Sequence, residues 1–157
     1  MFVLRSVWRP TASVGRVWSV LADPRFTWPD WWPGLTTAAT GPAVGPDGLA
    51  APGAWAVLQV RSPLGYALRF RLELTESVPP SDAGPGRARL DVSGDLAGRA
   101  DVTVGPGRPG TEVRLLWQVS PGPAWLRAAA RIAPAPLTWA HARVMRRGEQ
   151  GLSAHLG

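Results

Sequence analysis

The feature that most constrains the fold is an alternation of apolar and polar side chains through the middle of the chain. In YALRFRLELT, residues 66–75, every second side chain is apolar and most of those between are charged. Because successive side chains of a strand point to opposite faces, this pattern predicts a half-buried antiparallel β-strand. The face predicted to be buried carries Tyr66, Leu68, Phe70, Leu72 and Leu74.

The same alternation recurs and predicts further strands. ARLDV, LAGRADVTV and TEVRLLWQV follow it clearly, AWAVLQVRS also follows it, and LTTAATG follows it more weakly. Short segments rich in glycine and proline lie between them, as expected of turns. FVLRSVWR, residues 2–9, adds one more strand. The chain therefore predicts a seven-stranded antiparallel sheet in a single domain, residues 1–157.

Helical spacing appears after the first strand and again at the end of the chain. TASVGRVWSVLADP predicts a helix that Thr11 or Ser13 caps and Pro24 ends, with an apolar face of Val14, Val17, Trp18 and Leu21. A second helical region runs from about residue 123 to 156, where Pro134 and Pro136 must kink or break it. Its apolar stripe comprises Leu137, His141, Val144, Met145, Gly148, Leu152 and His155.

The segment TWPDWWPG places Trp28, Trp31 and Trp32 close together and closes them off with Pro33 and Gly34. At most one or two helical turns fit there, and in such a turn the three rings lie on neighbouring positions. A short helix is not stable by propensity alone, so buried indoles must anchor it. The rings either complete the core or form the wall of a ligand pocket.

Composition excludes several kinds of site. The chain has no cysteine and two histidines, and its carboxylates form no compact cluster, so we expect neither a metal nor a cofactor. The net charge is +6, and all 17 basic residues are arginine. They alternate with acids, as in RARLDVSGD, which favours solvated strand faces over a nucleic-acid surface. The sequence shows neither a targeting signal nor a long apolar run, so we expect a cytoplasmic protein without a membrane span.

Several segments resemble the SRPBCC superfamily, which includes START lipid-binding domains, pollen-allergen-like proteins and the polyketide cyclase/dehydrase family. These segments are VWSVLADPRFTWPDWWPGL, GDLAGRADVTV with GTEVRLLWQV, and WAHARVMRRGEQGL. The resemblance implies an α+β helix-grip fold, in which a seven-stranded antiparallel sheet wraps around a long C-terminal helix and two short helices follow the first strand. It also implies a cavity between sheet and helix that takes an apolar or amphipathic small molecule.

The hairpin around SPLG, residues 62–65, decides which side chains face that cavity. A turn of this length places Gln59 opposite Leu68 and Trp55 opposite Leu72, so both would point inward. A turn one residue longer or shorter would reverse this. With this register, the predicted ligand-binding residues are Trp28, Trp32, Trp55, Gln59, Tyr66, Phe70, Trp117, His141 and Met145.

Two functions of the cavity remain open from the sequence, beside a role in protein interaction. The first is binding of a hydrophobic ligand by a carrier or sensor. The alternative is a polyketide cyclase/aromatase-like enzyme, in which His141, Tyr66 or Arg61 would act as acid or base. No nucleophile lies beside a base at a recognisable spacing. His141 has its own structural alternative, a core histidine bonded to a strand carbonyl.

Trp139 falls outside the apolar stripe of the last helix. Three alternatives are open: it stacks on Arg143, one helical turn away, it forms the contact of a homodimer, or the kink at Pro136 rotates it inward.

Overall fold

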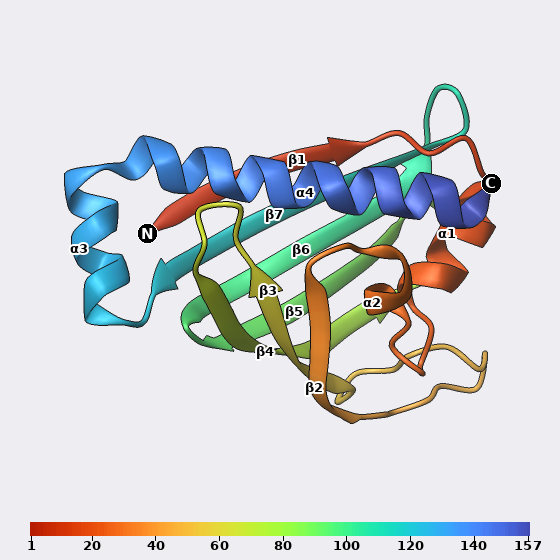
Figure 1. Ribbon diagram of the computed structural model, residues 1–157. Helices are drawn as coiled ribbons and strands as arrows, with labels where there is room; N and C mark the ends of the chain where they lie inside the picture. Colours follow the sequence, from red (N-terminus) through yellow and green to blue (C-terminus); the bar gives the residue numbers. More distant parts are fainter.

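The computed structural model describes residues 1–157 and has the predicted α+β architecture. An antiparallel sheet wraps around one face of the long C-terminal helix, and the shorter helices close the ends (Figure 1). The helix-grip fold expected from the sequence is therefore confirmed. In chain order the elements are β1 (Phe2–Trp8), α1 (Val14–Leu21), α2 (Trp28–Trp31), β2 (Leu35–Gly41), β3 (Trp55–Arg61), β4 (Ala67–Val78), β5 (Gly86–Gly94), β6 (Leu96–Pro106), β7 (Thr111–Pro121), α3 (Ala124–Ile132) and α4 (Pro134–Leu156).

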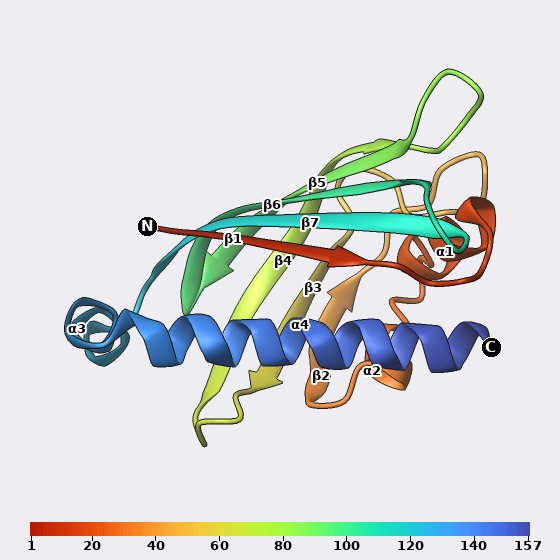
Figure 2. The same cartoon turned by 90° about the horizontal axis from the view of Figure 1, so that it is seen from above.

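The seven strands lie in the order β1-β7-β6-β5-β4-β3-β2, and every neighbouring pair is antiparallel. Strands β2 to β7 follow one another as hairpins, while β1 pairs with β7 at the far edge. Viewed from above, β1 and β7 run along α4 and the other end of the sheet slants toward it (Figure 2). The sheet thus presents a concave apolar face to the helix.

Helix α1 forms as its sequence predicts. Ser13, rather than Thr11, is the N-cap, and its Oγ accepts a hydrogen bond from the Arg16 N–H at 3.4 Å. Val17 and Trp18 are buried. The helix ends before Pro24, and the Ala22 N–H at its C-cap still donates to the Trp18 carbonyl.

The C-terminal region is broken rather than kinked. Helix α3 ends at Ile132 and α4 begins at Pro134, where the missing proline N–H would have had no helical partner. No helix of the protein has the length and apolar character that a membrane span requires. On α4, Met145, Gly148 and Leu152 are buried as predicted.

The prediction for His155 is wrong, because its side chain is exposed and Leu156 is buried in its place. Positions three and four residues after Leu152 both lie near the buried face of a helix. The apolar side chain takes the buried position at the last turn, and the imidazole turns to solvent.

A cluster of tryptophans fixes α4 against α2 and β1. The Trp8 and Trp32 rings lie 5.2 Å apart between centroids, and Trp31 stacks on Trp32 at 5.7 Å. The cluster faces Gly148, where an added Cβ would lie 2.6 Å from the Trp32 ring. The glycine therefore lets the helix backbone approach the indoles, and no side-chain gap remains there for a ligand.

Candidate ligand-binding site

Two cavities lie between the sheet and the helices. One, of about 130 Å³, lies between α4 and the strands β1, β3, β4 and β7, and we call it the α4 cavity. The other, of about 110 Å³, lies beneath α1 and the segment that follows β2, and we call it the α1 cavity. Both are lined mainly by hydrophobic residues. The wall that they share consists of Trp28, Trp32, Leu72 and Trp117.

Most of the predicted site residues come together in the α4 cavity. They arrive from four parts of the chain: α2 and its C-cap, the β3–β4 hairpin, β7 and α4. Those that line it are Trp28, Trp32, Tyr66, Phe70, Trp117, His141 and Met145.

The tryptophan segment therefore has both of the roles that its sequence left open. Trp31 lies outside both cavities and is part of the core. Trp32 is buried, and its indole N–H donates to the Val144 carbonyl of α4 at 3.0 Å. It therefore packs in the core and also forms part of the cavity wall. Trp28 is half-buried, donates to the Leu21 carbonyl at 2.9 Å, and lines both cavities.

The predicted register of the β3–β4 hairpin is wrong by one residue. Arg61 pairs with Ala67, Gln59 with Arg69 and Trp55 with Glu73. The turn is longer than predicted, because the Ser62 N–H donates to the Tyr66 carbonyl and Gly65, at φ +94°, reverses the chain. Gln59 consequently points to the outer face of the sheet and is exposed. The residues that face inward instead are Ala56, Leu58 and Val60.

Trp55 also lies on the outer face. Its indole covers Gly41, its partner across β2 and β3, and the Arg71 guanidinium sits 4.8 Å from the ring centroid. This is a cation–π contact at the sheet surface. Trp55 touches only the α1 cavity, at the first residue of β3, and is not part of the cavity that contains His141.

The sequence did not identify several residues that line the α4 cavity. Leu58 was missed because the predicted hairpin register was wrong. Leu4 was also missed, although the alternation in β1 indicates that it lies on the inner face. Leu126 comes from α3, which precedes the break at Ala133 and lies at a steep angle to α4 (Figure 1). No periodicity relates Leu126 to the stripe on α4, so the sequence offers no signal for it.

Two side chains that line the α4 cavity each have a buried nitrogen without a hydrogen-bond partner: the indole Nε1 of Trp117 and the imidazole Nε2 of His141. Their rings lie 6.3 Å apart between centroids, at an angle of 77°. A third unpartnered atom, Trp31 Nε1, lies outside both cavities. Since buried polar groups are normally hydrogen-bonded, these two nitrogens are the unsatisfied polar groups of the cavity lining.

Burial lowers the pKa of His141 to about 4, so the imidazole is neutral at pH 7. Its Nε2 contacts neither Tyr66 nor a strand carbonyl within hydrogen-bonding distance. At this nitrogen, therefore, the structure does not show the alternative of a core histidine bonded to a strand carbonyl.

No charged side chain lines the α4 cavity. The α1 cavity touches Asp23 and Asp101, and each is paired with arginine. The pKa of Asp23 is lowered mainly by the hydrogen bond from Arg25. The charges of the molecule are thus kept away from the space beside His141.

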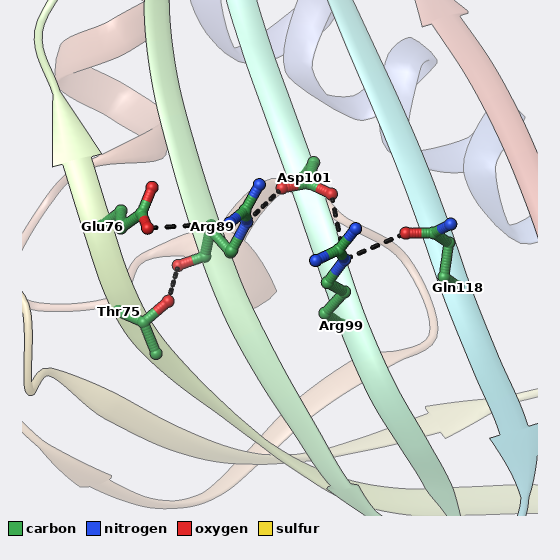
Figure 3. A network of polar contacts seen from close by, with 6 residues as sticks. All are labelled: Thr75, Glu76, Arg89, Arg99, Asp101 and Gln118. Carbon is green, nitrogen blue, oxygen red and sulfur yellow. Dashed lines mark hydrogen bonds and ion pairs between the residues drawn. The ribbon is translucent and has the colours of Figure 1, made fainter.

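The outer face of the sheet, by contrast, carries a ladder of alternating charges (Figure 3). Arg89 donates to Asp101 at 2.8 Å and lies 3.6 Å from Glu76. Arg99 donates to Gln118 at 2.9 Å and lies 3.7 Å from Asp101. The strand arginines shown in Figure 3 thus have acidic partners on their own face, the pattern expected of a solvated surface.

Comparison of the sequence with known protein families gives no match, and neither does comparison with curated protein sequences. Comparison of the structure does give matches. The KanY protein, solved by NMR, is 14% identical with a TM-score of 0.68, covering 99% of this chain and 97% of its own. TTHA0849 from Thermus thermophilus is 14% identical with a TM-score of 0.65, covering 98% and 99%. Ms6760 from Mycobacterium smegmatis is 16% identical with a TM-score of 0.61, covering 98% and 90%. At such identities the likeness shows a shared fold and nothing about function.

Proposed function

We propose that the protein binds a hydrophobic or amphipathic small molecule in the α4 cavity, as a carrier or sensor. The observation that supports this is the cavity itself: 19 of its 23 lining residues are hydrophobic and none is charged. Its volume of about 130 Å³ is close to that of an engineered cavity of about 150 Å³ that stays dry and binds benzene. An apolar cavity with a few convergent polar groups is the usual composition of a small-molecule site.

We also propose that the chain belongs to the SRPBCC superfamily. Its order of elements and the position of the cavity between sheet and C-terminal helix support this, together with the sequence segments quoted above.

The expected affinity for a one-ring ligand follows from the surface that it buries. A ring the size of a phenylalanine side chain buries about 150–250 Å², worth on the order of 4–6 kcal/mol at about 25 cal/mol per Å². That range corresponds to dissociation constants of about 1 mM to 40 µM. Larger ligands that also occupy the α1 cavity, past the wall formed by Trp28 and Trp117, would bind more tightly.

A pair of substitutions on α4 tests the proposal. Ala140 is buried and lines the cavity, whereas Ala142 is exposed on the same helix. Ala140→Leu fills part of the cavity, so we expect it to weaken binding of ethylbenzene or a naphthalene dye at least tenfold in calorimetric titrations. Ala142→Leu should leave binding unchanged. Equal affinities in both variants, with the fold intact, would contradict binding in this cavity.

Of the acid/base candidates for the enzyme alternative, Arg61 is exposed outside the cavity, Tyr66 lines it, and the one imidazole among them is His141. A pKa of about 4 makes it a weak base at neutral pH, and no carboxylate lies in the same cavity to support it. Steady turnover of a polyketide-type carbonyl substrate that Ala140→Leu and His141→Phe both abolish would favour a cyclase. Saturable binding without turnover would favour the carrier or sensor.

A further inference from the structure

The lining of the α4 cavity includes a pair of buried nitrogens without hydrogen-bond partners, Trp117 Nε1 and His141 Nε2, in surroundings that are otherwise apolar. We infer that this pair selects an uncharged ligand with one oxygen function, a hydroxyl or a carbonyl, on an apolar body. The inference rests on the proposed function and adds the chemical class of the ligand.

Most of the other polar side chains that line this cavity already have partners. Trp28 and Trp32 donate their indole N–H groups to the backbone carbonyls of Leu21 and Val144. Toward the ends of the cavity, Thr138 donates to the Pro134 carbonyl, and the Ser62 Oγ accepts from the Leu64 N–H. None of these groups needs a ligand.

Tyr66 lies farther out, where its ring packs against the half-exposed Trp125 at 5.4 Å between centroids. Its phenol is not among the buried atoms that lack a partner. Of the polar groups in this cavity, only Trp117 and His141 are both buried and unpaired.

The chemistry of the pair fixes what it accepts. An indole N–H can only donate, so the ligand must offer an acceptor to Trp117. A neutral imidazole Nε2 accepts or donates according to its tautomer. One hydroxyl can serve both kinds of group, because its oxygen accepts from an indole N–H and its proton can go to an imidazole nitrogen, and a carbonyl oxygen can accept from both when Nε2 carries the proton. A hydrocarbon would leave both nitrogens unsatisfied.

A carboxylate fits poorly in the same place. The cavity has no arginine to pair with it, although the chain contains 17 basic residues. With a pKa of about 4, only about one His141 in a thousand is protonated at pH 7. An anionic ligand would have to be buried without a counter-ion, which is strongly unfavourable.

A series of ligands with one skeleton tests this inference. Ethylbenzene, 1-phenylethanol, acetophenone and benzoate share the ring and nearly the same size, and they differ in the oxygen function and the charge. In the wild type at pH 7, we expect the alcohol and the ketone to shift the indole N–H resonance of Trp117 in ¹⁵N-labelled protein, whereas ethylbenzene binds without this hydrogen-bond shift. We expect benzoate to bind at least 100-fold more weakly than acetophenone.

Three variants separate the polar contribution from the shape of the cavity. Trp117→Phe and His141→Phe should each lower the affinity for acetophenone relative to ethylbenzene about tenfold, because one ligand hydrogen bond is lost. Phe70→Leu is the control: Phe70 packs on Trp117 at 6.2 Å between centroids and has no polar atom, so it should change both affinities alike.

The outcomes distinguish this inference from the function on which it rests. If ethylbenzene and the other ligands all fail to bind, the proposed function is wrong. If ethylbenzene binds but the Trp117 resonance ignores the alcohol and the ketone, the inference is overturned. Benzoate binding as tightly as acetophenone would overturn it as well, and both of these readouts use the wild-type protein.

Discussion

Replacing Gly148 by alanine should destabilise the protein, although alanine is the better helix former. The added Cβ would lie 2.6 Å from the Trp32 ring and 2.8 Å from the Trp8 ring. Both rings are buried, with relative exposures of 7% and 2%. The rings or the helix must therefore move by several tenths of an ångström within a packed core.

The magnitude follows from two opposing terms. Overpacking a core typically costs about 1–3 kcal/mol. The change from glycine to alanine inside a helix gains about 0.8–1.0 kcal/mol. The balance is a loss of up to about 2 kcal/mol in the free energy of unfolding for Gly148→Ala, which lowers the Tm by up to roughly 8 °C for a chain of this size.

Gly15 in α1 provides the matched control. It is exposed, it lies in a helix, and an added Cβ there meets no atom within 4 Å. Gly15→Ala should therefore raise the free energy of unfolding by about 0.5–1 kcal/mol. Chemical denaturation of both variants measures the difference. If Gly148→Ala is stabilised as much as Gly15→Ala, α4 is not held against the tryptophans in the way described.

Three further predictions concern charge and association. Because the pKa of His141 is lowered from 6.5 to about 4 in the folded protein, the unfolded state binds more protons and stability falls as the pH drops from 6.5 to 4. The expected loss in the free energy of unfolding is about 3 kcal/mol. Urea denaturation at pH 7 and pH 4 measures it, and the His141→Phe variant should not show it. Equal losses in the two proteins would refute the burial of His141. Trp139 is 52% exposed, and we propose that it forms a homodimer contact. A protein that stays monomeric at all concentrations in sizing experiments would exclude this contact. DNA binding should be weak, sequence-blind and lost with salt, so nanomolar binding at about 200 mM salt would contradict this.

The strands were predictable because each hairpin repeats a simple physical rule. Phe70, Leu72 and Leu74 are buried on one face of β4, as the alternation in the sequence predicts. Most strands show their inner face in this way, and segments rich in glycine and proline separate one strand from the next. The break before Pro134 was also predictable, since proline has no N–H to continue a helix.

The orientation of β3 was not predictable, because it depends on the length of one turn. Reading SPLG as the whole turn placed Gln59 in the cavity, whereas the turn extends to Tyr66 and places Leu58 there. The sequence of β3 is apolar on both faces at Ala56, Val57 and Leu58, so composition did not correct the error.

The polar pair in the cavity lay further beyond the sequence. Trp117 and His141 were each predicted to face inward, from β7 and α4. Their nitrogens lack partners because of the way the side chains of β7 and α4 pack. The indoles of Trp28 and Trp32, by contrast, find partners in the backbone. Such pairing is a property of the packed interior and has no signature in periodicity.

The most direct test of ligand binding in the α4 cavity uses the two methionines of the chain. Met145 is buried and lines the cavity, whereas Met1 is 86% exposed at the N-terminus. In protein labelled with ¹³C at the methionine methyl groups, titration with ethylbenzene should shift the Met145 resonance saturably and give nuclear Overhauser contacts to the ligand, while Met1 stays unchanged. A Met145 resonance that does not move at ligand concentrations up to solubility, in folded protein, would contradict the account.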